Sequence, residues 1–291
     1  MYYITAAILR KFLKIQSLSP DAPPRYNGEN GKEARAVPVE LLPLVGFLAG
    51  FLVISFGGGG GGIYVGVLTG LCGVSPELAA STSLATVIPT TLVGALGHIR
   101  AGNVDFRLAG ILLASALVGT VLGTYASTLL PESAYLLISG GLLVALSTQM
   151  LYTYVRQRGR AFRDPAAPLS PKERLTAWAW GLLSGLMTGA VGLSGGGPVT
   201  AALFQLHCPA LRTVGTSVMV ISVMSVAGFL AHLSVGRFDW TLVLYLTAGT
   251  IAGAAAAPYA LARLGRERAE TVIRPAIIAV NYTLGILILM K

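Results

Sequence analysis

The sequence predicts an all-α polytopic membrane protein, with about eight transmembrane segments in two four-segment repeats that each open with a glycine-broken helix. Of the 291 residues, 54% are hydrophobic and 11% are charged, whereas a soluble domain carries about 25% charged residues. The apolar residues fall in long runs, and motifs of one half recur in the other. This composition excludes a soluble enzyme and a disordered protein. The net charge of +9 is spread over the gaps between apolar runs, which excludes a basic nucleic-acid groove.

Residues 1–40 form a separate, basic N-terminal tail. Its first part, 1–16, mixes apolar residues with arginine and lysine and is too short to span a bilayer, while 17–40 is polar and contains proline. No small-residue cleavage site follows an apolar core, so a signal peptide is not predicted. We expect an interfacial amphipathic helix or an unstructured tail.

From Leu41 onward the chain holds eight apolar segments. A spanning helix needs about 20 apolar residues, which six segments provide, while the first and fifth are longer and are interrupted by glycine clusters. Each long segment either crosses completely as a broken helix or re-enters and leaves on the same face. The segments are 41–71, 78–98, 108–129, 134–154, 175–206, 213–232, 240–262 and 272–290.

The linker 155–174 separates a first transmembrane repeat, 41–154, from a second, 175–291. It contains six Lys and Arg residues, and under both treatments of the long segments it lies on the more basic side, which is cytoplasmic. We therefore expect a multi-pass protein of the cell membrane, in a bacterium the inner membrane. The middles of the spans hold no Asp, Glu, Lys or Arg, which argues against a chain of acidic proton carriers.

The two halves share motifs at an offset of about 134 residues. His98 and His232 each begin the pattern His-x3-Gly-x2-Asp-aromatic, and a glycine cluster and a Thr-Ser pair precede it in both halves. Duplicated halves are typical of secondary transporters, whose substrate site lies where corresponding interrupted helices meet. We expect parallel repeats, related by an axis along the membrane normal, with inverted repeats as the alternative.

The glycine clusters predict an anion-binding site. Six glycines in a row at 57–62 cannot hold a regular helix, so a helix that starts after them aims unpaired N–H groups and its positive end into a buried cavity. The second half repeats this break, and nearby hydroxyls supply further donors. The alternative is close helix packing through small residues. The predicted substrate-binding residues are Gly58, Gly59, Gly60, Gly61, Gly62, Thr82, Ser83, Ser194, Gly195, Gly196, Gly197, Thr216 and Ser217.

These motifs resemble the TauE/SafE family of sulfite and organosulfonate exporters. The resemblance rests on Gly46-Phe-Leu-Ala-Gly50-Phe, the glycine cluster, Ala79-Ala-Ser-Thr-Ser83 and the histidine motif, with counterparts in the second half. It covers about residues 42–290. The resemblance implies an integral membrane permease of small sulfur-containing oxyanions that acts outward. The six consecutive glycines and the long tail depart from the usual family pattern.

Several polar residues lie at predicted span ends. His98 and His232 are candidates for gating or proton coupling, since histidine titrates near neutral pH, or they are simply polar helix ends. Arg212, near the start of the sixth span, either guides anions or snorkels to the interface. In the histidine motifs, the glycines are predicted C-caps and the aspartates predicted N-caps. These caps are Gly102, Gly236, Asp105 and Asp239.

The expected function is secondary transport, in the form of a proton-coupled exporter of small sulfur-containing oxyanions such as sulfite or organosulfonates, and not an enzyme. One alternative is a passive anion channel. Another is an intramembrane serine protease, because Gly192-Leu-Ser194-Gly195 has the form such enzymes use and His232 lies two spans later. Cys72 and Cys208 are expected to be two small buried residues, with one bridge between them as the alternative. The expected partners are a small anion and the lipid bilayer, with no nucleic acid, cofactor or metal, and the oligomeric state stays open.

Overall fold

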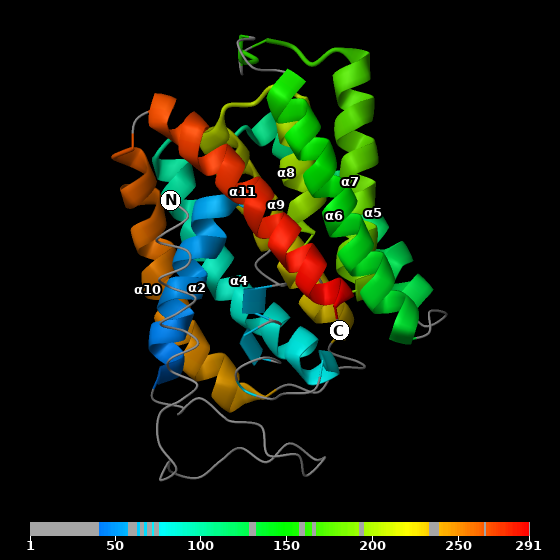
Figure 1. The fold of residues 1–291 in the computed structure, drawn as a ribbon, viewed down its shortest axis with the longest axis vertical. Helices are drawn as coiled ribbons and strands as arrows, with labels where there is room; N and C mark the ends of the chain where they lie inside the picture. The colour runs from blue at the N-terminus through cyan, green and yellow to red at the C-terminus, as the bar shows by residue number, and fades with distance from the viewer. Residues whose placement is uncertain are drawn as a thin grey trace.

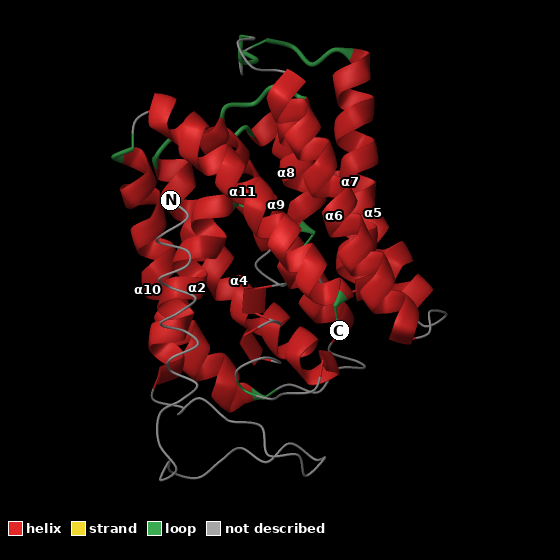
Figure 2. Ribbon diagram, viewed as in Figure 1, coloured by secondary structure: helices red, strands yellow, loops and turns green. Residues whose placement is uncertain are grey.

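The computed structural model is all-helical over the residues it describes (Figures 1 and 2). It describes residues 41–57, 63–64, 67–68, 72, 76–127, 132–156, 161–164, 167–191, 195–232, 239–264 and 266–290. The predicted tail 1–40 lies outside this part of the chain. The helices are α2 (Leu42–Phe56), α4 (Pro76–Arg100), α5 (Phe106–Ser127), α6 (Glu132–Arg156), α7 (Pro171–Val191), α8 (Gly196–Gln205), α9 (Ala210–His232), α10 (Trp240–Ala262) and α11 (Arg266–Leu289).

Among the helices that the structure describes, four are long and apolar enough to cross a membrane: α4, α5, α9 and α10. Helix α2 is apolar but has only 15 residues. Large apolar side chains face outward, as in α5, where Val121 is 72% exposed, and in α10, where Leu244 is 69% exposed. A water-soluble monomer rarely exposes so much apolar surface. The all-α membrane class is confirmed, and the count of eight spans stays a prediction.

Helices α2 and α10 come from different halves of the chain and pack closely through glycines. A Cβ atom at Gly46 or Gly50 of α2 would collide with the backbone of Leu246 or Thr250. Gly249 of α10 in turn lies against Pro43 and Phe47. Because both residue numbers rise together along the contact, the two helices run parallel.

Helices α5 and α7 repeat this arrangement with the halves exchanged. Gly181 and Gly185 of α7 lie against the backbone of Leu112 and Ala116 in α5. These glycines let the two helix backbones approach closely, as small residues do in membrane helices. The opening helix of each half therefore packs against a helix of the other half: α2 against α10, and α7 against α5.

The second long apolar segment folds as a helical hairpin of α7 and α8. The Ser184 hydroxyl donates to the Gly195 carbonyl oxygen at 2.7 Å, and the Trp180 indole N–H donates to the Gln205 side-chain oxygen at 2.7 Å. Helix α8 therefore runs back along α7. Its ten residues extend only about 15 Å, half of a bilayer core. This segment follows the re-entrant alternative.

Helices α6 and α11 correspond to each other in the 134-residue register, and they run antiparallel. Gly140 of α6 lies against Gly285 and Leu289 of α11, while the Thr148 hydroxyl lies 2.5 Å from the Tyr282 hydroxyl. An axis along the membrane normal would make these helices parallel. The expected parallel arrangement of repeats is therefore wrong for this pair (Figure 1).

Both cysteines are free and buried, so the expectation of two small buried residues is confirmed and the bridge between them is not formed. The predicted caps are confirmed where they are described. Gly102 is left-handed, with φ +69°, and ends the turn after α4. The Asp105 carboxylate accepts the Leu108 N–H at the start of α5. Asp239 does the same for Leu242 at the start of α10, while Gly236 lies outside the described residues.

Candidate functional site

The start of α8 is a buried helix N-terminus built from glycine. Gly195 is the N-cap and is left-handed, with φ +62°, and Gly196 and Gly197 are buried. The hydrogen bond between Ser184 and Gly195 shows where along α7 the start of α8 lies. Ser184 lies thirteen residues into α7, which is about 20 Å along that helix. The first-turn N–H groups and the positive end of the helix dipole thus lie deep inside the bundle.

The local sequence explains this geometry. A side chain at Gly195 would meet the hydroxyls of Ser184 and Thr188 at 2.5 Å, and the left-handed backbone disfavours any other residue. Thr200, one turn later, donates its hydroxyl back to the Gly196 carbonyl at 2.9 Å. Its hydroxyl therefore points back toward the start of α8.

The predicted hydroxyl donors are all buried, and the structure separates them. The Thr216 hydroxyl oxygen accepts the Asp105 N–H at 2.9 Å, whereas the Thr82 hydroxyl oxygen accepts the Asp239 N–H at 3.3 Å. Asp105 follows the C-terminal end of α4, but Thr82 lies in the second turn of α4. The two threonines therefore lie toward opposite ends of this helix, and each bonds the loop of the other half. Their neighbours Ser83 and Ser217 are also fully buried.

Several predicted site residues cannot be placed. Gly58 to Gly62 and Ser194 lie outside the described residues, and so does the side chain of His232. His98 is described: its side chain is fully buried in the last turn of α4. Its Nε2 atom lies 3.4 Å from the Ile54 carbonyl oxygen of α2, and its Nδ1 atom has no partner among the described residues.

Charged residues gather where the described part of the linker meets the bundle. Arg163 forms an ion pair with Asp105 at 3.2 Å and a second with Glu173 at 3.4 Å. Its backbone N–H donates to the His207 carbonyl oxygen at 3.0 Å. The backbone N–H and the hydroxyl of Ser170 each donate a hydrogen bond to the Glu173 carboxylate. These bonds, and then the nearby Arg163, lower the pKa of Glu173 below its usual range. The linker is thereby fixed to the first turns of α5 and α7.

A second buried ion pair anchors the start of α9. The Arg274 guanidinium lies 2.8 Å from Glu270, donates to the Cys208 carbonyl oxygen at 2.6 Å and lies 4.8 Å from the centre of the Phe204 ring. The Glu270 carboxylate also accepts the N–H of Ala210, the first residue of α9. These contacts fix the α8–α9 turn against α11.

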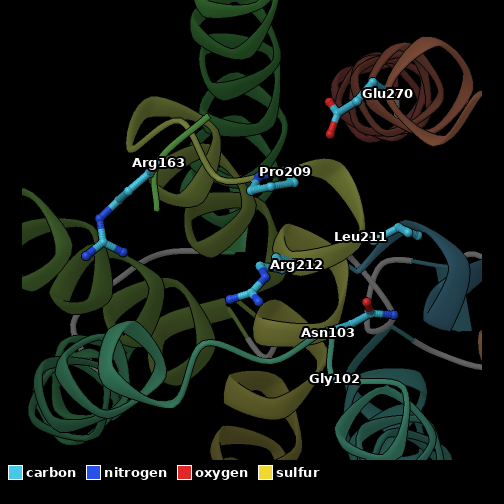
Figure 3. Close-up of a pocket in the computed structure, with 7 residues that line it drawn as sticks. All are labelled: Gly102, Asn103, Arg163, Pro209, Leu211, Arg212 and Glu270. Atoms are coloured by element: carbon cyan, nitrogen blue, oxygen red, sulfur yellow. The ribbon is translucent and has the colours of Figure 1, made fainter. Parts of the chain in front are cut away.

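A cavity of about 310 Å³ opens beside this turn. Figure 3 shows Arg212 between Arg163 and Asn103, with Glu270 of α11 at the upper right. The sequence singled out Arg212 but missed Asn103, Arg163 and Glu270 as its neighbours. The feature that could have identified these three residues is their location, because each lies in or next to a loop on the linker side of the bundle. The lining residues are Gly102, Asn103, Arg163, Pro209, Leu211, Arg212 and Glu270.

The known proteins that this chain resembles are membrane transport proteins. The family model "Sulfite exporter TauE/SafE" matches residues 42–288. The chain is 27% identical over 250 residues to the "Probable membrane transporter protein YdhB" of Bacillus subtilis, covering 86% of this chain and 99% of that protein. It is 27% identical over 227 residues to "Probable membrane transporter protein YunE" of the same organism, covering 72% and 83%. A "Probable membrane transporter protein" of Haemophilus influenzae is 26% identical over 200 residues, covering 66% and 73%. No solved structure significantly matches the chain.

Proposed function

The chain belongs to the sulfite exporter TauE/SafE family, and from this premise we propose that it is a secondary transporter that exports small sulfur-containing oxyanions such as sulfite or organosulfonates. Membrane transport is the activity that the names of its relatives share. The observation that carries the proposal is the glycine-built N-terminus of α8, buried about 20 Å along α7. Half-helix N-termini near the membrane midplane are the places where such transporters bind anionic groups.

Backbone donors suit a substrate that must also leave. The N–H groups of Gly196 and Gly197 point at an oxyanion without a formal opposite charge, so binding does not require a permanent ion in the apolar core. We propose that Gly58 to Gly62 and Ser194, which lie outside the described residues, supply further donors to the same anion. Thr82, Ser83, Thr216 and Ser217 line the path at its two ends.

The halves are proposed to be inverted repeats, 41–154 and 175–291, joined by a cytoplasmic linker at 155–174. Two reciprocal features support this arrangement: the exchanged helix pairs α2–α10 and α7–α5, and the exchanged Thr-to-Asp hydrogen bonds. The antiparallel pair α6 and α11 fits an axis in the membrane plane. Motion of one repeat against the other would then break one Thr–Asp bond while keeping its counterpart, and so open one face at a time.

The last part of the proposal is that transport is coupled to protons. His98 is the proposed coupling residue whose side chain the structure describes. The test uses inside-out proteoliposomes and a panel of sulfite, thiosulfate, sulfoacetate and sulfate. We expect a proton gradient to drive uphill accumulation of at least one sulfur oxyanion. Equilibration without accumulation would instead support the passive anion channel.

The binding site is tested separately by Gly196→Leu. This change places a bulky side chain at the start of α8 and should abolish transport. Gly110→Leu is the matched control, since a Cβ atom there meets no atom within 4 Å. Unchanged transport of every panel anion by Gly196→Leu would refute the site. Ser194→Ala tests the protease alternative, in which peptide cleavage would be lost completely.

A further inference from the structure

The cavity beside the first turn of α9 is distinct from the buried start of α8. We propose that it is a second oxyanion site, in which Arg212 is the counter-ion, and that it captures the substrate from the linker side before transport. This inference rests on the proposed function, because it names the entry point for the same class of substrate. Four observations carry it: the charge balance of the cavity, its donors, its rigidity and its size.

The charge balance leaves Arg212 as the uncompensated group. Arg163 is neutralised by its ion pairs with Asp105 and Glu173, and Glu270 is neutralised by Arg274 at 2.8 Å. Arg212 is only partly exposed and forms no ion pair or hydrogen bond with any residue that the structure describes. The residues that line the cavity include two arginines and one glutamate, a formal net charge of +1, and Arg212 is the arginine among them that has no carboxylate partner among the described residues.

The donors of the cavity match an oxyanion. A guanidinium presents a planar fork of N–H groups that binds two oxygens at once, and the Asn103 side-chain amide adds neutral N–H donors. The positive end of the α9 dipole reinforces both, since Arg212 lies in the first turn of that helix. A cation would find no unpaired carboxylate here, so the cavity selects anions.

The frame around these donors is rigid. The Asn103 N–H donates to the His98 carbonyl oxygen at 3.0 Å, and Gly215 of α9 packs directly against the Asn103 carbonyl. The Ala210 N–H is held by Glu270. These contacts fix the backbone that carries the donors, so less conformational freedom is lost there when an anion binds.

The size of the cavity limits its ligand. Its volume of about 310 Å³ is at the lower end of the roughly 300–1,000 Å³ typical of small-molecule sites. This volume fits a compact oxyanion such as sulfite or a short sulfonate. The same donors would also bind the phosphate of an anionic lipid headgroup, so the experiment must separate a free anion from a lipid.

The test compares Arg212→Gln with Arg263→Gln, using the full chain in sided proteoliposomes. Arg263 is the matched control, since it is exposed at the C-cap of α10 and does not line the cavity. Arg212→Gln should raise KM for sulfite about 10-fold or more from the linker side and leave kcat and the KM from the opposite side unchanged. Arg212→Lys, which keeps the charge but not the fork, should have an intermediate KM and keeps the test usable if the glutamine variant does not fold.

Two further arms decide between the sources of the oxyanion and separate the two proposals. The Arg212 effect should be the same in phosphatidylcholine vesicles with and without phosphatidylglycerol, and an effect seen only with the anionic lipid would overturn the inference. Sulfite should also raise the melting temperature of the purified wild-type chain more than that of Arg212→Gln. Transport with an unchanged KM and unchanged stabilisation in Arg212→Gln would overturn the entry site alone. Arg212-dependent binding by a chain that transports none of the panel would overturn the proposed function alone.

Discussion

Gly195 should be the glycine whose replacement by alanine is unusually costly for its size. Its φ of +62° costs an alanine about 1–2 kcal/mol. The new methyl group would also lie 2.5 Å from the hydroxyls of Ser184 and Thr188, and relieving that contact breaks the 2.7 Å hydrogen bond from Ser184 to the Gly195 carbonyl. A lost hydrogen bond costs about 1 kcal/mol. We therefore expect Gly195→Ala to destabilise the protein by about 2–3 kcal/mol.

The chain offers a matched control at Gly102. This glycine has nearly the same backbone, with φ +69°, but a Cβ atom there meets nothing within 4 Å. Gly102→Ala should therefore show only the backbone cost, about 1–2 kcal/mol.

The assay is thermal unfolding of the detergent-purified variants followed by loss of the monodisperse peak. For a chain of this size, 1 kcal/mol shifts the melting temperature by about 2–4 °C. Gly102→Ala should lose about 4 °C and Gly195→Ala about twice that. Ser184→Ala combined with Gly195→Ala should recover part of the loss, because it removes one clashing hydroxyl. If Gly195→Ala is no more destabilising than Gly102→Ala, α8 does not start against α7 as described and the reasoning fails.

Four further predictions test the remaining parts of the structure. Asp105→Ala should lower the melting temperature more than Asp105→Asn, because asparagine keeps the α5 cap, worth about 1 kcal/mol, and loses only the ion pair with Arg163; equal losses would deny the cap. The lowered pKa of Glu173 stabilises the fold above the unfolded pKa, and this part is lost as the pH falls through the lower folded value, so Glu173→Gln should flatten the melting temperature against pH below about 5. Thr216→Val removes the acceptor of the Asp105 N–H and should increase labelling of a cysteine at Asn103 from the linker side, and unchanged labelling would show that this hydrogen bond does not hold the linker side closed. His98→Gln should keep downhill sulfite flux but abolish uphill accumulation, and a variant that still accumulates sulfite would remove His98 from the coupling.

The sequence was a good guide wherever a local rule operates. The caps at Gly102, Asp105 and Asp239 are correct because a left-handed turn or a free helix N–H selects its residue within three or four positions. The glycine break before α8 is likewise visible in the chain alone. In contrast, the packing glycines of α2 and α7 look the same in a sequence as breaking glycines, since both are defined only by the missing side chain.

The candidate site shows the same division. Arg212 was recognisable as a basic residue near a span end, but its neighbours come from the α4–α5 loop, the linker and α11. Thr82 and Thr216 were predicted as hydroxyl donors to the substrate, but a motif that recurs in two halves does not say whether the equivalent residues lie close together. The structure gives each a backbone partner in the other half.

By itself, the sequence determined the membrane class, the described helix ends and the recurrence of motifs in both halves of the chain, because hydropathy, backbone freedom and capping act over a few residues. The tertiary structure alone decided how the halves interlock, that α6 and α11 run antiparallel and that the second long segment turns back as α8. A 134-residue repeat is identical for a parallel and an inverted pair. Only contacts between residues far apart in the chain, such as Gly140 with Gly285 and Thr148 with Tyr282, distinguish the two.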